Sequence, residues 1–284
     1  MSKKKNVAIL SVASNTFLII IKLIVGTISG SVSILSEAIH SGMDLIAAII
    51  AFFSVRISDQ PADPKHPYGH GKFENISGVI EALLIFAASI WIIYEAVQKM
   101  LIHDTVDNLG YGFVVMFISA IVNFFVSRRL YKVAHETESI ALEADALHLK
   151  ADVITSAGVG VGLLLIVVTG LHWLDPIVAI LVALFIMKES YVLLKRSYSP
   201  LLDTALTDNE MKTINQSITK FSPNFHHLRT RRAGHYKFVD FHIEMAESTT
   251  IGQAHALCDA IEDEIKQHIS NVEVTIHVET PDEK

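Results

Sequence analysis

Residues 32–57 read VSILSEAIHSGMDLIAAIIAFFSVRI, a mostly apolar run with His40 and Asp44 four residues apart. The run is longer than the roughly 20 helical residues that cross a bilayer core of about 30 Å. Ionisable side chains inside such a segment are costly in lipid, and they mark functional sites by default. The segment therefore predicts a membrane-spanning helix that carries a polar site.

Five other segments have the same apolar character, and composition agrees with a polytopic membrane protein. Hydrophobic residues make up 51% of the 284 residues, and the mean hydropathy of +0.41 is too high for an ordinary soluble domain. Nothing in the sequence suggests nucleic-acid binding. We expect six transmembrane helices, at Val7–Ile28, Val32–Ile57, Ser77–Met100, Leu109–Leu130, Ile140–Val168 and Leu174–Leu194.

Basic residues gather in alternate connections between these spans. The connections 29–31, 103–108 and 170–175 contain no Lys or Arg. Cytoplasmic loops carry the excess of Lys and Arg, so we expect both termini in the cytoplasm. The basic residues that choose this orientation are Lys3, Lys4, Lys5, Arg56, Lys65, Lys72, Arg128, Arg129, Lys132, Lys195 and Arg196.

A change to mixed polar sequence after Asp203 predicts a transmembrane domain at residues 1–203 and a cytoplasmic domain at 204–284. Thr207 with Glu210, and Thr250 with Gln253, have the spacing of capping boxes that begin helices. We expect the first helix to run to about Phe221 and the second to about His268.

Strand signals accompany these two helices. Apolar and polar residues alternate over Phe238–Met245 and Val272–Glu279, which is typical of half-buried strands, and a further strand is expected near Leu228–Arg232. The resulting order is α-β-β-α-β, a compact α+β domain. The predicted fold is therefore an α-helical membrane protein of six transmembrane helices followed by a small α+β domain.

The strongest chemical signal is a repeated pair of ligands. His40 and Asp44 on the second span, and His148 and Asp152 on the fifth, are each four residues apart, so each pair shares one helix face. If the two faces meet, they supply two nitrogens and two oxygens, a tetrahedral set suited to Zn²⁺. Metal binding at these groups competes with protonation, which predicts proton antiport; facilitated diffusion down the zinc gradient is the alternative.

Other ionisable residues in the spans allow two interpretations. Glu37 and Asp145 each lie seven residues before the aspartate of a pair, on roughly the same face. They either support the ligands and line the entrance, or lie solvated near the cytoplasmic side. Glu81 and Lys22 have the same two alternatives.

A second candidate site lies in the loop after the second span. Asp63, His66 and His70 place three metal ligands over eight residues, among prolines and a glycine that favour a turn. A polar loop often contains histidines, so the spacing alone leaves an ordinary solvated loop open.

The chain resembles the cation diffusion facilitator (CDF) family, in particular its bacterial YiiP/FieF-like branch of zinc exporters. The resemblance covers almost the whole chain and rests on the six spans and the two His/Asp pairs. Its other motifs are the loop Gln60–Lys72, Leu201–Asp203, Leu228–Arg231 and His242–Met245.

The resemblance implies an exporter of divalent metal cations, not an enzyme. It would carry Zn²⁺ out of the cytoplasm by proton antiport with alternating access, with Cd²⁺, Fe²⁺, Co²⁺ or Mn²⁺ as lesser substrates. It would work as a homodimer in the lipid bilayer of the bacterial inner membrane, with its metallochaperone-like C-terminal domain at the dimer interface.

The resemblance also implies residue roles, with zinc as a structural or regulatory ion outside the transport site. Lys72 and Asp203 match a charged pair that joins the two domains, and Leu147 matches a hydrophobic gate. The implied ligands are His40, Asp44, His148 and Asp152 for transport, Asp63, His66 and His70 in the loop, and His226, His242, His255, His277 and Glu279 in the C-terminal domain.

Two positions depart from that branch. His40 and Glu279 stand where close bacterial relatives have aspartates. The imidazole of His40 favours zinc over manganese, because all-oxygen ligand sets suit Mn²⁺. The longer Glu279 changes the reach of its carboxylate.

Two other kinds of membrane protein also bind metal ions. A membrane metalloenzyme would show a base or nucleophile beside the metal, as in His-Glu-x-x-His, and the sequence has no such motif. A membrane-anchored metal sensor would not need six spans that carry ligands. Metal transport is the function that the sequence favours.

Overall fold

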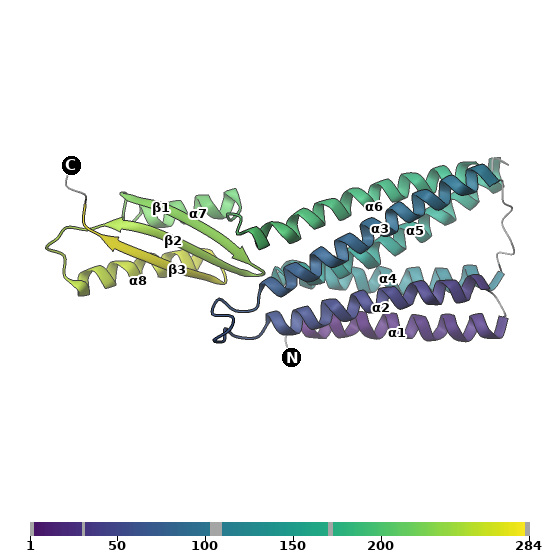
Figure 1. Cartoon of the computed structure of the whole chain (residues 1–284), viewed down its shortest axis with the longest axis horizontal. Helices are drawn as coiled ribbons and strands as arrows, with labels where there is room; N and C mark the ends of the chain where they lie inside the picture. The colour runs from purple at the N-terminus through teal and green to yellow at the C-terminus, as the bar shows by residue number, and fades with distance from the viewer. Residues whose placement is uncertain (1–2, 30–31, 103–109, 170–172, 282–284) are drawn as a thin grey trace. The chain divides into compact units, whose positions relative to one another are not determined.

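The computed structural model describes the chain except for residues 1–2, 30–31, 103–109, 170–172 and 282–284. It divides into two compact units, Met1–Tyr198 and Ser199–Lys284. In the described residues of the first unit all regular secondary structure is α-helical, and the second unit contains a small sheet with two α-helices (Figure 1).

Long helices cover every predicted span, and several continue beyond it. α3 begins five residues before the predicted Ser77, and α4 and α6 continue past Leu130 and Leu194. Hydropathy marks the part of a helix that lies in lipid, whereas the backbone ladder continues into polar sequence. Leu109 lies outside the described residues. The helices are α1 (Lys3–Ser29), α2 (Val32–Ser58), α3 (Lys72–Ile102), α4 (Gly110–Thr137), α5 (Ile140–Thr169) and α6 (Leu174–Tyr198).

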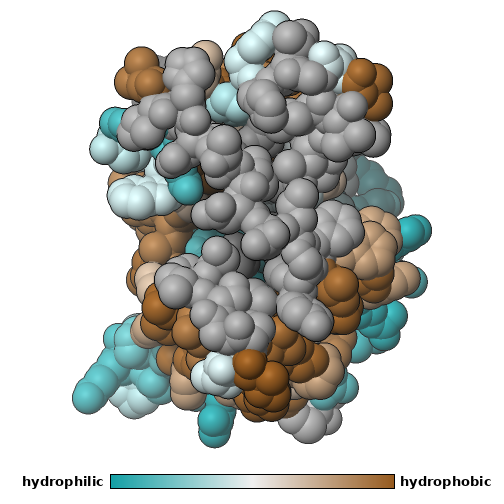
Figure 2. All heavy atoms as spheres, turned by 90° about the vertical axis from the view of Figure 1, so that its right-hand side faces the viewer, coloured by the Kyte–Doolittle hydropathy of each residue, from teal (hydrophilic) through white to brown (hydrophobic). Residues whose placement is uncertain are grey.

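Apolar side chains cover the outside of this helical unit. Phe17, Trp91 and Phe125 are each more than half exposed, and the end-on view shows hydrophobic side chains around the flanks of the bundle (Figure 2). Such a surface is unfavourable in water and suited to lipid. Among the described residues, α1, α2, α3 and α6 hold stretches long and apolar enough to cross a membrane.

Helix α5 packs within the bundle against two buried clusters. One cluster joins α5 to α1, α2 and α4 and includes Val55, Leu130 and Leu149. The other joins α5 to α3 and α6 and includes Ile85 and Leu193. Because packed cores deform little, this arrangement holds the face of α5 that carries His148 and Asp152 in a defined position.

The second unit has the predicted α-β-β-α-β order. A short 3₁₀ turn (Ser199–Leu202) precedes α7 (Asp208–Thr219), β1 (Phe225–Ala233), β2 (Tyr236–Glu244), α8 (Ile251–His268) and β3 (Val272–Glu279). Both predicted capping boxes are confirmed at Thr207 and Thr250. The sheet order is β1-β2-β3, with β1 antiparallel and β3 parallel to β2.

The alternation along β2 separates a core face from a polar face. Val239, Phe241 and Ile243 are buried against the two helices, as a half-buried strand requires. Phe238, on the other face, is also buried, with the Arg231 guanidinium 4.4 Å from its ring centroid. His242 also lies on this second face of the sheet, which therefore exposes the imidazoles described below.

Candidate metal centres

The two His/Asp pairs of α2 and α5 meet inside the helical unit. One ligand atom each from His40, Asp44 and Asp152 lies within 4.8 Å of the others. His148 joins them through Nε2, which lies 3.0 Å from Asp44 Oδ1. Asp44 is buried, whereas His40 is exposed on the surface of the single chain. The structure therefore brings together the four residues that the matched spacing singled out.

Sequence reasoning missed Asn123, a neighbour of this group. Asn123 is buried on α4, and its Nδ2 donates to Asp152 Oδ2 over 3.3 Å. This contact orients the carboxylate, as polar partners of metal ligands commonly do. The available signal was a lone amide within residues 109–127, an apolar run without Asp, Glu, Lys or Arg.

Four ionisable residues of the spans are expected either to support the metal ligands or to lie in solvent. Three of the four are buried, so the solvated alternative is wrong for them. Asp145 is 1% exposed, Glu81 is 0% and Lys22 is 5%. Ser77 donates to Glu81 over 3.1 Å, and Lys22 donates to Ser41 over 2.7 Å. The side chain of Glu37 lies outside the described residues.

The loop between α2 and α3 brings Asp63, His66 and His70 together. Asp63 Oδ1 lies 3.3 Å from His66 Nδ1, and Asp63 Oδ2 lies 3.3 Å from His70 Nε2. Backbone N–H groups of His66 and Lys65 donate to Asp63 Oδ1. Of the factors acting on the Asp63 pKa, the hydrogen bond from the His66 backbone is the largest, and together they lower it.

The donor set of this loop fits a divalent ion. One ligand atom from each of the three residues lies within 4.8 Å of the others. His70 is 5% exposed, and its Nδ1 is a buried nitrogen that makes no hydrogen bond in the described part of the chain. One carboxylate and two imidazoles are ligands that Zn²⁺ commonly takes.

The polar face of the sheet gathers most of the remaining predicted ligands. His242 of β2 is paired in register with His226 on one side and with His277 on the other. The Glu279 carboxylate lies beside two of these imidazoles: His226 Nε2 lies 2.7 Å from Oε1, and His242 Nδ1 lies 3.2 Å from Oε2. The Nε2 atom of His277 lies 3.7 Å from the same Oε2.

These imidazoles change the acidity of Glu279. Burial is the largest single influence and raises its pKa, but hydrogen bonds and charge from His242 and His226 together outweigh it. The pKa of Glu279 is therefore below its ordinary value. An ionised carboxylate beside three imidazoles is a suitable donor set for a divalent cation.

Two histidines differ from the predicted set in this unit. His255 lies on α8, with a side chain 75% exposed and Nδ1 3.5 Å from Asp259, and it joins none of the described donor groups. His227, which sequence reasoning did not select, joins His226 and His242. The only signal for it was its position next to His226. Neighbouring strand residues normally point to opposite faces, so the sequence offered no reason to group the two imidazoles.

Comparisons with known proteins agree with this architecture. A family model described as the cation efflux transmembrane domain matches residues 8–202, and one described as the cation efflux protein cytoplasmic domain matches residues 206–281. Together they cover nearly the whole chain.

Similar proteins match over nearly their whole length. An uncharacterized transporter, sll1263, of Synechocystis sp. is 36% identical over 275 residues, 96% of this chain and 89% of that protein. The cation-efflux pump FieF of Shewanella oneidensis is 32% identical over 270 residues, 94% of this chain and 90% of the pump. A solved structure of the putative zinc transporter CzrB in its zinc form is 34% identical and covers 29% of this chain and 97% of that one, with a TM-score of 0.26.

The matches and the lipid-facing bundle define an integral membrane transporter of cations rather than an enzyme. Its second unit corresponds to the dimerisation domain of such transporters. The chain belongs to the cation diffusion facilitator family and is a YiiP/FieF-like member, a cation efflux transporter.

Proposed function

We propose that this transporter exports zinc from the cytoplasm in exchange for protons, and that His40, Asp44, His148 and Asp152 bind the transported ion. The convergence of these four side chains from α2 and α5 is the observation that supports the proposal most directly. Ionisable groups in a membrane-spanning bundle are retained where they bind an ion or relay protons.

The donor chemistry favours zinc as the main substrate. The four residues supply two imidazole nitrogens and two carboxylate oxygens, which match the tetrahedral preference of Zn²⁺. Mn²⁺ prefers all-oxygen sets, and two of the four donors here are nitrogens. Cd²⁺, Fe²⁺, Co²⁺ and Mn²⁺ are expected as lesser substrates.

The contact between His148 and Asp44 provides a basis for proton coupling. A hydrogen bond over 3.0 Å between Nε2 and Oδ1 requires a proton on one of these two atoms. Zinc binds through the same nitrogen lone pair, so it must displace that proton. An empty and fully ionised site would be costly in the membrane, which disfavours a return step with neither protons nor metal.

The other donor groups fit resident ions with a structural or regulatory role. Asp63, His66 and His70 would hold one in the loop, and His226, His242, His277 and Glu279 would hold one or two on the sheet. We include His255 as a ligand supplied near the interface of a homodimer. Zinc would draw the two C-terminal domains together and shift the conformational equilibrium of the dimer.

The basic residues and the bacterial relatives support a placement in the cell. We place the protein in a bacterial inner membrane with both termini in the cytoplasm. The transport domain comprises residues 1–203 and the cytoplasmic domain residues 204–284. Zinc bound from the cytoplasm would then leave on the opposite and more acidic side.

Purified protein in liposomes tests the proposal. With equal zinc on both sides, an imposed pH gradient should drive net zinc movement toward the acidic side, measured with a zinc-sensitive dye. Asp152→Ala should abolish this flux, whereas Asp240→Ala, on the exposed strand face, should retain it. Unchanged flux in Asp152→Ala would refute the site. Active protein that moves zinc only down a zinc gradient would refute the coupling.

A further inference from the structure

A β-bulge interrupts the pairing of β1 and β2 beside the imidazole cluster. His226 pairs with His242, but the next register pair is Arg229 with Asp240. Two residues of β1, His227 and Leu228, therefore stand opposite one residue of β2, which is the definition of a bulge.

The bulge changes which face His227 uses. Phe225 and Leu228 both pack against the hydrophobic core of this unit, although they are three residues apart. In a regular strand, residues three apart point to opposite faces. The extra residue lets both reach the core, and it leaves His226 and His227 together on the polar face.

His227 has a strained backbone at this position. Its φ is 52°, in the left-handed region that glycine adopts freely and that a side chain with a Cβ disfavours. A bulge with its first residue in this conformation usually has glycine there. An imidazole at a position that favours glycine motivates the hypothesis that the side chain has a function.

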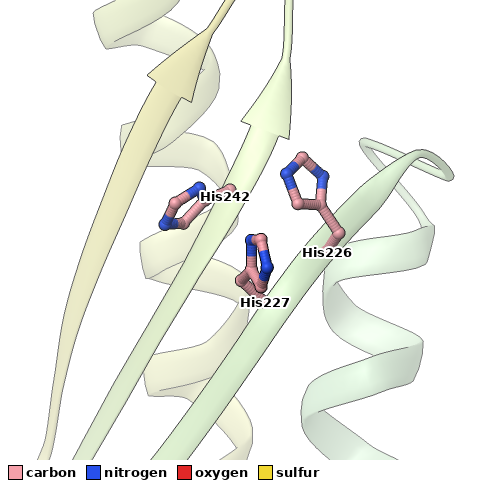
Figure 3. Close-up of side chains that lie close together, drawn as sticks. All are labelled: His226, His227 and His242. Carbon is pink, nitrogen blue, oxygen red and sulfur yellow. The ribbon is translucent and has the colours of Figure 1, made fainter. Parts of the chain in front are cut away.

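The three imidazoles gather beside one another on the sheet. The ring centroid of His226 lies 4.9 Å from that of His227 and 5.3 Å from that of His242, and the centroids of His227 and His242 lie 5.0 Å apart. Figure 3 shows the three side chains around a shared space. One nitrogen of each lies within 4.8 Å of the others. Nitrogens on one tetrahedral zinc ion lie about 3.3 Å apart, given Zn–N bonds of about 2.0–2.1 Å, so modest side-chain rotations would close the site.

We infer that His227 is a metal ligand, and that with His226 and His242 it forms a three-imidazole site for a borderline divalent transition cation such as Zn²⁺ or Co²⁺. The inference extends the sheet site of the proposed function, which on its own needs no contribution from His227. Glu279, 2.7 Å from His226, or a water molecule would complete the coordination.

The donor set defines which cations this site takes. Three neutral imidazoles suit Zn²⁺, Co²⁺, Ni²⁺ and Cu²⁺ and are poor ligands for Mg²⁺ and Ca²⁺. A second donor group, His242 with His277 and Glu279, shares His242 with the first. Because His242 offers one nitrogen to a given ion, the two groups compete for it, and His227 strengthens the group on the β1 side.

The test uses the full-length protein in detergent, in an Asp152→Ala and His70→Ala background that removes a ligand from each of the other two sites. Zn²⁺ affinity is measured by chelator competition, and Co²⁺ absorption reports tetrahedral coordination. His227→Gly removes the imidazole and relieves the left-handed backbone. Asn271→Gly, at another non-glycine residue of positive φ (54°), is the matched control because it introduces glycine at a similar backbone angle without removing an imidazole.

We expect both glycine variants to raise the melting temperature of the metal-free protein. Only His227→Gly should weaken zinc binding, by at least about tenfold, the loss typical of removing even an outer partner of a metal ligand. If His227→Gly keeps the affinity of the background while His242→Gln loses it, His227 is not a ligand and the sheet site of the proposed function stands. If neither variant weakens binding, both ideas fall.

Discussion

Replacing Glu74 with glutamine removes one charge from a buried polar cluster at the start of α3. The Glu74 side chain is fully buried, and its carboxylate accepts from Lys4 Nζ over 3.1 Å and from Ser58 Oγ over 2.6 Å. The hydroxyl of Ser139, just before α5, also donates to it. One carboxylate thus connects α1, α2, α3 and the start of α5.

The size of the effect follows from the burial of the ion pair. The Lys4 side chain is only 8% exposed, so the substitution leaves its charge in a site of low polarity. Removing one partner of a buried ion pair costs about 3–5 kcal/mol. Lys4 keeps Asp59 at 3.6 Å, and glutamine keeps an acceptor oxygen, so we expect about 3 kcal/mol, the lower end of that range.

Thermal unfolding in detergent at one scan rate measures this loss. About 3 kcal/mol corresponds to a decrease in Tm of roughly 6–12 °C, at about 2–4 °C per kcal/mol for a protein of this size class. Glu143→Gln is the matched control, because its partner Arg196 is 55% exposed and the pair should contribute at most about 1 kcal/mol. Equal Tm decreases in the two variants would refute the reasoning.

Three other perturbations have defined outcomes. Gly78→Ala would place a Cβ 2.5 Å from Ser197 Oγ and 3.1 Å from Ser197 Cβ, so it should lower the stability of the α3–α6 pair by about 1–3 kcal/mol in thermal unfolding. Gly42→Ala is the control: a Cβ there has nothing within 4 Å, so this variant should not lower stability. Burial raises the pKa of Glu210, but hydrogen bonds from its capping box and nearby positive charges outweigh it and hold the pKa below its ordinary value. The stabilisation is therefore present above the unfolded pKa of about 4.3 and lost as pH falls through the folded pKa, so hydrogen exchange in α7 should separate wild type from Glu210→Gln at neutral pH and not in acid. His40→Asp should weaken the preference for Zn²⁺ over Mn²⁺ in competition flux assays, and an identical metal ranking would count against an imidazole ligand at this position.

The helices and their ends could be predicted from the sequence because their causes are local. An apolar run long enough to cross a bilayer predicts a span wherever it lies in the chain, and each of the six falls within one observed helix apart from Leu109. The capping boxes at Thr207 and Thr250 depend on residues three apart, and both are present. The family was also predicted from the motifs, and the comparisons confirm it.

Part of the candidate chemistry could be predicted for the same reason. Residues four apart on a helix share a face, so the spacing of the His/Asp pairs of α2 and α5 is enough to place each pair on one side of its helix. The structure brings the pairs together, with His148 3.0 Å from Asp44. Their role as transport ligands stays a prediction that the flux assays test.

Burial and register depended on contacts between segments far apart in the chain. Asp145 has the same local sequence whether it is solvated or buried, and only the packing of α5 in the bundle decides that it is 1% exposed. The bulge at His227 arises because Phe225 and Leu228 must both reach a core that α7, α8 and the other strands complete. A period of two along β1 would have placed the two adjacent histidines on opposite faces.

Sequence alone therefore determined a six-span membrane protein with two His/Asp pairs, each on one helix face, and an α+β domain, because hydropathy, helical periodicity and capping act over a few residues. Tertiary structure decided which ionisable groups are buried and which imidazoles meet, because those outcomes depend on strand register and helix packing. His227 shows the difference most clearly: its neighbour His226 is adjacent in the chain, but only the pairing of β1 with β2 brings both to His242.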